Sequence, residues 1–326
     1  MSLVTRDDFT ETLSKIKQRG FAFVLSKLSL SKQNRTKSSF NEIDFEAANW
    51  WSIPEVKNRL AEKATGDRNL SYEDYVVENH LKGREGLRLL SLGCGIGSHE
   101  LRFARHQAVF YEVLGVDISD KLVSQANKVA EQEGLTNLSY KIGDVNRLNI
   151  APNTYDVVLF HASLHHFSPI EKLLGETVFS LLKQDGFLVI NEYVGPSRLQ
   201  LTKAQVAEVN TILKDSIPQK YRVRLATKRI KQRVSGPGGV RMILSDPSEA
   251  VDSASIMPAI ARYYQPVEEK MLGGNILSPL LKDIAHHFQS EDVEAMALLK
   301  KLFALEDKFL ESNPSDLVFG VYRKRG

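Results

Sequence analysis

A glycine pattern near residue 95 is the first feature of the sequence that points to chemistry. The segment reads Ser91-Leu92-Gly93-Cys94-Gly95-Ile96-Gly97-Ser98 and stands between an apolar run and a stretch of helical periodicity. Glycine allows tight turns and lets a ligand approach the main chain without a Cβ atom in the way. The free N–H groups at the start of a helix favour electron-rich or anionic ligand atoms. The pattern therefore indicates a ligand-binding loop, although a lone glycine pattern is a weak signal.

Carboxylates and histidines follow three further apolar runs. Asp117 ends the second run, where a carboxylate can accept both hydroxyl hydrogens of a ribose, and Asp144 after the third run can accept from an adenine amino group. His161, His165 and His166 follow the fourth run. If these runs are parallel strands, all four segments lie at the carboxyl edge of one sheet, where such folds bind ligands.

The candidates for a general base are His165, His166 and Glu192. Imidazole titrates near neutral pH, which suits it to accept a proton from a hydroxyl group or an amine. The structural alternative is that the histidines cap the next helix or line a ligand pocket. The three side chains could also converge on a metal ion, but no ligand spacing supports one, so no metal is expected. Cys94 is interpreted as a small loop residue and not as a nucleophile.

The elements that must position these residues alternate between apolar strands and helices from residue 87 onward. Parallel strands need crossover connections, so this alternation predicts an α/β fold with a doubly wound, mostly parallel sheet. Seven strands are predicted, the last two after helical insertions: Leu87–Leu92, Glu112–Val116, Leu138–Ile142, Tyr155–Phe160, Phe187–Asn191, Tyr264–Leu272 and Leu317–Arg323.

Two parts of the chain are predicted. Residues 1–84 form an N-terminal helical segment that acts as a lid, and residues 85–326 form the ligand-binding domain. Helical insertions are predicted within that domain at about 197–262 and 275–311, and the first includes a helix over Lys220–Val234.

With these residues in place, residues 85–195 and the two late strands resemble the class I S-adenosylmethionine-dependent methyltransferases, which have a Rossmann-like seven-stranded sheet. A looser similarity, through Asn191–Pro196 and Asp246–Val251, is to uncharacterised bacterial members linked with sugar or surface-glycan modification. The resemblance implies S-adenosylmethionine as cofactor and S-adenosylhomocysteine as product. It implies these cofactor-binding residues: Ser91, Gly93, Cys94, Gly95, Gly97, Asp117, Ile118, Asp144, Val145 and His161.

A nicotinamide-dependent oxidoreductase is the rival interpretation of the glycine loop. Its fingerprint needs a third glycine where this chain has Ser98. Asp117 would serve either cofactor. Asp144 and the late pair of strands favour methyl transfer.

Two motifs that are absent from the sequence limit the possible classes of methyl acceptor. The Asp- or Asn-Pro-Pro-aromatic run of enzymes that methylate base amino groups is replaced by His161–Leu164, and the single cysteine lies in the glycine loop, where it cannot serve carbon-5 pyrimidine methylation. The predicted reaction is O-methylation of a small-molecule, sugar, glycan or lipid-linked acceptor. The alternative is an RNA methyltransferase.

The charge distribution bears on that choice. The 326-residue chain has a net charge of +3, but residues 12–40 hold seven basic side chains and residues 216–241 hold eight, with no acidic residue in either segment. Such segregation indicates an anionic partner, or two solvated helix faces. A small or glycan-like, anionic acceptor is expected, with contact to a membrane surface as an option; nucleic acid is the less favoured partner, and the oligomeric state is left open.

Composition suggests where the protein works. A single cysteine excludes an internal disulfide, and no run approaches the ~20 apolar residues of a membrane span. The polar opening residues do not read as a secretory signal. These features predict a cytoplasmic protein.

Overall fold

The computed structural model describes Thr5, Asp8 and residues 49–148, 150–239, 242, 247–290 and 292–326. The basic segment 12–40 lies outside the described residues. Contacts divide the chain into two compact units. The helical unit comprises residues 1–60, 195–249 and 272–317, and the sheet unit comprises residues 61–194, 250–271 and 318–326. This division differs from the predicted boundary at residue 84, because residues 61–84 pack with the sheet.

The sheet unit is built on seven strands in the order β3-β2-β1-β4-β5-β7-β6. The pairs β1–β2, β2–β3, β1–β4 and β4–β5 are parallel. The doubly wound α/β fold is thereby confirmed, and the two late strands are neighbours as predicted. The strand bounds are β1 Leu87–Leu92, β2 Phe110–Asp117, β3 Leu138–Ile142, β4 Tyr155–His161, β5 Leu182–Tyr193, β6 Tyr264–Gly273 and β7 Leu317–Lys324.

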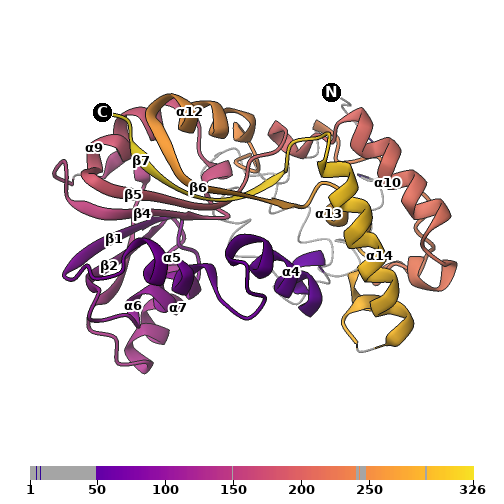
Figure 1. Ribbon diagram of the computed structural model, residues 1–326, viewed down its shortest axis with the longest axis horizontal. Helices are drawn as coiled ribbons and strands as arrows, with labels where there is room; N and C mark the ends of the chain where they lie inside the picture. The colour runs from indigo at the N-terminus through magenta and orange to yellow at the C-terminus, as the bar shows by residue number, and fades with distance from the viewer. Residues whose placement is uncertain are drawn as a thin grey trace. The chain divides into compact units, whose positions relative to one another are not determined.

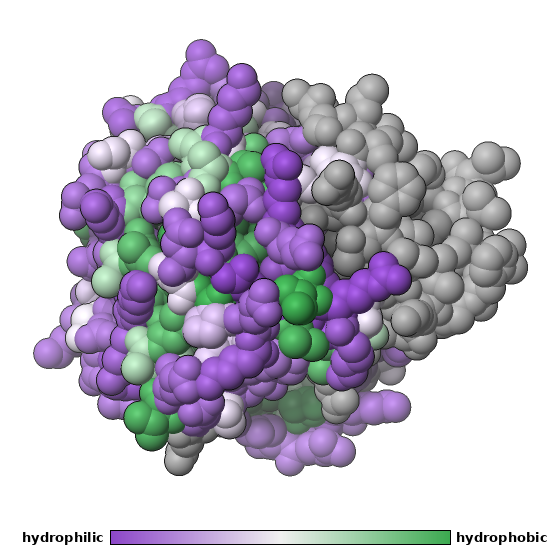
Figure 2. Space-filling view, turned by 90° about the vertical axis from the view of Figure 1, so that its right-hand side faces the viewer, coloured by the Kyte–Doolittle hydropathy of each residue, from purple (hydrophilic) through white to green (hydrophobic). Residues whose placement is uncertain are grey.

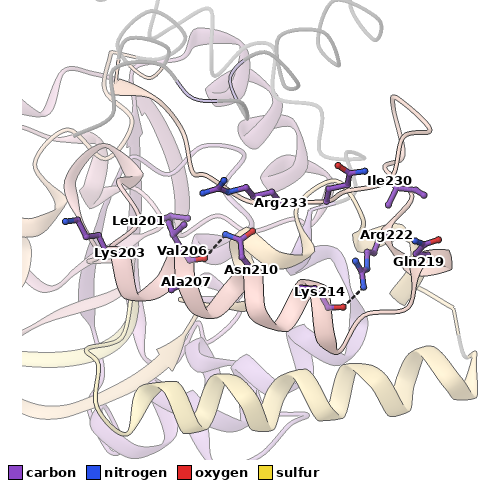
Figure 3. A pocket seen from close by; sticks show the side chains of 11 residues that line it. Leu201, Lys203, Val206, Ala207, Asn210, Lys214, Gln219, Arg222, Ile230 and Arg233 are labelled. Atoms are coloured by element: carbon purple, nitrogen blue, oxygen red, sulfur yellow. Dashed lines mark hydrogen bonds between the residues drawn. The ribbon is translucent and has the colours of Figure 1, made fainter.

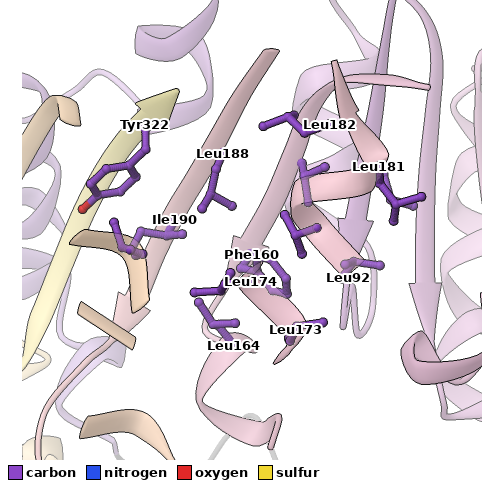
Figure 4. Close-up of a cluster of buried hydrophobic side chains, with 14 of the residues drawn as sticks. Leu92, Phe160, Leu164, Leu173, Leu174, Leu181, Leu182, Leu188, Ile190 and Tyr322 are labelled. Carbon is purple, nitrogen blue, oxygen red and sulfur yellow. The ribbon is translucent and has the colours of Figure 1, made fainter. Parts of the chain in front are cut away.

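Helices cover both faces of this sheet (Figure 1), so its central strands are apolar on both sides. All residues of β4 from Tyr155 to Phe160 are buried. Figure 4 shows part of the core, where Phe160 of β4 lies beside Leu174 of the helical segment that follows β4. Leu188 and Ile190 of β5 belong to the same cluster. The helices of the sheet unit are α5 Tyr72–His80, α6 Ser98–Ala104, α7 Asp120–Gln132, α8 Ile170–Lys172, a π turn over Leu173–Val178, α9 Phe179–Leu181 and α12 Ile256–Tyr263.

The helical unit has its own apolar core, which includes Trp50, Ile212, Leu280 and Leu302. Helix α10 begins with a capping box in which Thr202 and Gln205 each bond the other's backbone N–H. The helices of the helical unit are α10 Lys203–Asp215, α13 Leu277–Leu281 and α14 Val293–Leu310. The residues of α4 Pro54–Thr65 are divided between the two units.

The predicted helix over Lys220–Val234 is wrong. Only a short turn over Gln219–Arg222 is helical, and an isolated antiparallel bridge joins Val223 to Ile230. Lys231 explains the difference, because its buried ammonium group donates to three backbone carbonyl groups some 50 residues away. A distant contact of this kind overrides local propensity.

Hydrophilic side chains dominate the face of the molecule shown in Figure 2, with smaller apolar areas between them. No helix among the described residues is both long and apolar enough to cross a bilayer.

Candidate cofactor-binding and catalytic site

The glycine loop connects β1 to α6 and is tied to the neighbouring strand. The N–H groups of Gly93 and Cys94 donate to the Val116 carbonyl oxygen at 2.8 and 3.2 Å. Gly97 has a φ of +78°, and a Cβ atom there would lie 2.4 Å from the Tyr140 ring, whose hydroxyl donates to the Gly97 carbonyl oxygen at 2.7 Å. At Gly95, with a φ of +56°, a Cβ atom would meet open space. Only glycine fits at position 97, and the loop at Gly95 is accessible to a ligand.

Asp117 lies at the end of β2 and binds the loop directly. One carboxylate oxygen accepts from the Gly95 N–H at 2.9 Å, and the other accepts from the Ser119 N–H at 2.8 Å. A carboxylate has about four acceptor positions, so lone pairs are left for the two hydroxyl groups of a ribose.

The residues after β3 lie beside Asp117. The Gly143 N–H donates to the Asp117 backbone carbonyl oxygen at 2.9 Å. Asp144 is partly buried, and its carboxylate lies 3.7 Å from the Arg147 guanidinium group, while Val145 is buried. Ile118 is partly buried. The structure thus brings the ends of β1, β2 and β3 together as predicted.

Ser91 and Cys94 face the protein interior. The Ser91 hydroxyl group, which is buried, bonds to the carboxyl group of Glu100, and burial raises the pKa of Glu100. Burial likewise raises the pKa of the Cys94 thiol, which disfavours the reactive thiolate. These contacts favour a structural role for the Ser91 side chain and an inert thiol at Cys94.

Glu192, at the end of β5, organises the turn after β4. Its carboxylate accepts from the N–H groups of Ser163 and Leu164 at 2.7 and 2.6 Å and bonds to His165 Nδ1 at 2.5 Å. The Ser163 hydroxyl group donates to the Leu92 carbonyl oxygen at 2.8 Å, which joins this turn to the glycine loop. So many bonds favour Glu192 as the group that orients His165 and not as a base. The His166 ring centroid lies 4.2 Å from that of His165.

The sequence analysis singled out His161 at this edge but missed the polar side chains around it, Tyr72, Glu73 and His99. His161 Nδ1 bonds to the Tyr72 hydroxyl group at 3.1 Å, and its ring stacks on His99 with 3.4 Å between centroids. His99 in turn pairs with the buried Glu73 at 2.5 Å. Burial and the neighbouring His99 lower the pKa of His161 well below its usual range, so this imidazole is neutral at neutral pH.

The buried face of α5, which only the structure shows, identifies this group. Tyr72, Glu73 and Val76 are buried together on α5, so a carboxylate stands on the buried face of a short helix. A buried carboxylate needs a partner. The partner itself, on α6, could not be read from spacing.

Comparisons with known proteins bear on the same residues. A family model described as a methyltransferase domain matches residues 84–270, more than half of the chain. The uncharacterized methyltransferase YcgJ of Bacillus subtilis (strain 168) is 32% identical over 107 residues, which is 32% of this chain and 41% of that protein. The ubiquinone biosynthesis O-methyltransferase of Coxiella burnetii (strain RSA 331 / Henzerling II) is 28% identical over 161 residues, which is 49% of this chain and 64% of that protein.

Among solved structures, the phosphoethanolamine N-methyltransferase 2 of Haemonchus contortus in complex with S-adenosyl-L-methionine matches with a TM-score of 0.48 and 16% identity, covering 84% of this chain and 57% of that one. The chain spans between one third and two thirds of the length of the first curated relatives it matches. The matched residues 84–270 include the glycine loop, Asp117 and the segment His161–His166.

Proposed function

The chain belongs to the methyltransferase domain family, that is, to the class I S-adenosylmethionine-dependent methyltransferases, and we propose that it methylates a hydroxyl oxygen of a small-molecule, glycan or lipid-linked acceptor. The relative named as a ubiquinone biosynthesis O-methyltransferase supports an oxygen acceptor. S-adenosylmethionine is the cofactor of the family, and when bound it supplies a methyl group that is already activated on a sulfonium.

The residues at the carboxyl edge of the sheet fit this cofactor. The open space beside Gly95 lets a ligand reach the main chain, and Asp117 keeps acceptor capacity for ribose hydroxyl groups. These residues and Asp144 would hold the cofactor. The remaining task of the protein is to position the acceptor and to receive its proton.

The His165–Glu192 pair is the observation that carries the proposal of an oxygen acceptor. A hydroxyl group usually needs a base, whereas an amine need only arrive uncharged. Glu192 bonds Nδ1 of His165 at 2.5 Å, which directs the other ring nitrogen, Nε2, to accept a proton. The carboxylate also stabilises the imidazolium ion that forms. We assign the base to His165 and the positioning of its ring to Glu192.

A matched set of variants tests this assignment. We expect His165→Gln to lower kcat by about 100-fold, within the range for loss of a general base, with little change in the affinity for S-adenosylmethionine. Glu192→Gln should shift the pH dependence of kcat, because the base loses its charged partner. His106→Gln, which alters a histidine paired with Asp74 on the surface, is the control.

Two results would change the proposal. Full activity of His165→Gln together with loss of activity in His161→Gln would move the base to His161. Full activity of both variants would remove the histidine base and favour an amine acceptor.

The acceptor class is tested by incubating the protein with methyl-labelled cofactor and an extract of its source cells. We expect label in the lipid or small-molecule fraction. Label in the nucleic-acid fraction that is lost on RNase treatment would contradict this and favour RNA. The contacts of residues 216–241 support the preference for such an acceptor over RNA, because four of the basic side chains there bond within the protein: Lys220 to Glu294, Arg224 to Asp283, and Arg222 and Lys231 to backbone carbonyl groups.

A further inference from the structure

A pocket of about 650 Å³ lies on one face of α10, within the helical unit (Figure 3). Lys203, Val206, Asn210 and Lys214 of α10 line it, and their spacing of three or four residues places them on one face of the helix. The opposite wall is the segment 219–233. The volume falls in the range of small-molecule sites.

The two walls of this pocket are joined by hydrogen bonds. The Asn210 amide donates to the Val234 carbonyl oxygen at 2.7 Å and accepts from the Val234 N–H at 2.8 Å. Arg222 donates to the carbonyl oxygens of Ile217 and Lys214 at 2.6 and 2.7 Å. The pocket is therefore formed by anchored elements and not by a loose loop.

Its lining combines cations with apolar surface. Among the residues that the structure describes, four cationic side chains line it, Lys203, Lys214, Arg222 and Arg233, and no carboxylate does. Lys203 and Arg233 lie toward one end, and Arg222 and Lys214 toward the other (Figure 3). Within the described part of the chain, the side chains of Lys203, Lys214 and Arg233 make no hydrogen bond or ion pair. Unpaired like charges around a cavity repel one another, and an anion relieves that repulsion.

Apolar side chains also line the pocket. Leu201, Val206, Ala207 and Ile230 contribute to the lining, and Ile230 is 43% exposed. An exposed branched aliphatic side chain in the same lining as unpaired cations fits a ligand that has both an anionic group and an apolar body.

We propose that this pocket binds an organic phosphate with an apolar body. A phosphate group carries close to two negative charges at neutral pH and three acceptor oxygens, which matches several cations better than a carboxylate does. The cavity is larger than inorganic phosphate needs, so the rest of the ligand occupies the apolar part. The same headgroup chemistry can come from a free phosphorylated metabolite or from a lipid. The proposal does not depend on methyl transfer.

The test measures binding to the full-length protein by titration calorimetry, with decyl phosphate as the probe. Lys203→Gln/Arg233→Gln should weaken binding by about 10-fold or more, because two cations are lost. Lys228→Gln/Arg229→Gln removes the same charge from exposed residues of the same segment that do not line the pocket, and it should leave binding unchanged. Added salt should weaken binding to the unaltered protein.

Further probes identify the source of the ligand. Decyl phosphate binding with no binding to vesicles of anionic phospholipid supports a free metabolite, and binding to both supports a lipid. The proposal is overturned if decyl phosphate does not saturate a site, if both double variants weaken it equally, or if inorganic phosphate binds as tightly. Binding to vesicles or to an RNA oligonucleotide alone would also overturn it, since either indicates a surface contact.

Discussion

Asp117 is a single carboxylate that binds the protein backbone and that we expect also to bind the cofactor. Its two oxygens hold the backbone of Gly95 and of Ser119. We expect the same group to accept the hydroxyl hydrogens of a ribose. Its effect on the cofactor is therefore expected to be partly direct and partly through the shape of the loop.

Asp117→Ala is expected to weaken S-adenosylmethionine binding by about 10- to 100-fold, because charge-assisted hydrogen bonds are among the stronger ones. Titration calorimetry measures this. Asp120→Ala removes an exposed carboxylate three residues away and should have little effect. Unchanged affinity in Asp117→Ala would show that the ribose is not bound here.

Gly97 and Gly134 separate steric overlap from backbone strain. Both have positive φ, +78° and +66°, but a Cβ atom at Gly97 overlaps Tyr140 and one at Gly134 meets nothing within 4 Å. Gly134→Ala should cost about 1 kcal/mol of unfolding free energy through strain alone, and Gly97→Ala roughly 2–4 kcal/mol. Urea denaturation checks this. Equal costs would mean that the Tyr140 ring moves aside freely.

At the scale of the element, α13 is a five-residue helix held at both ends by buried charges. The Glu306 carboxylate accepts from the N–H groups of Gly274, Ile276 and Leu277 at 3.1 Å each. The Lys231 ammonium group donates to the carbonyl oxygens of Pro279, Leu280 and Lys282 at 2.8–3.0 Å. Each charge has the sign that the helix dipole favours at its end.

Lys231→Met should lower the free energy of unfolding by about 2–4 kcal/mol, because three backbone carbonyl groups, of which that of Leu280 is buried, lose their donor. Lys228→Met alters an exposed lysine of the same segment and should change the free energy of unfolding by less than about 0.5 kcal/mol. Urea unfolding measures both. If the two variants behave alike, water replaces the ammonium group at no cost.

At the scale of the whole molecule, the stability of the protein depends on the pH through a buried acid. Burial, together with the nearby Glu306, raises the pKa of Asp316 to about 6, although a hydrogen bond from Gln205 opposes the shift. In the unfolded chain the same carboxyl group titrates near its ordinary value of 3.8. The folded protein therefore holds a proton that the unfolded chain releases between these two values.

It follows that the contribution of Asp316 to stability is present below about pH 4 and is lost as the pH rises through about 6. Asp316→Asn has no carboxyl group to ionise, so it should not lose stability as the pH rises. The variant should raise the free energy of unfolding at pH 7 by about 3 kcal/mol at most. Urea unfolding from pH 4 to 8 tests the prediction. A variant with the same pH dependence as the unaltered protein would contradict it.

The strands and the glycine loop were predictable because their sequence signals are local. The bounds of β1 and β3 agree residue for residue with the predicted Leu87–Leu92 and Leu138–Ile142. A run of apolar residues between turn signals can be recognised without knowing which residues far away in the sequence contact it. The predicted helix over Lys220–Val234 was wrong because Lys231 is held by carbonyl groups in the segment 279–282.

The sequence by itself determined the fold class, the family and the placement of Gly93, Asp117 and His165 at the ends of strands, because parallel strands bring their carboxyl ends to one edge. Only the tertiary structure decided which side chains meet there. Tyr72 bonds to His161 across 89 positions of the chain, and Glu192 bonds to His165 across 27. The first pair depends on how α5 packs on the sheet and the second on the pairing of β4 with β5, and neither leaves a periodic signal in the sequence.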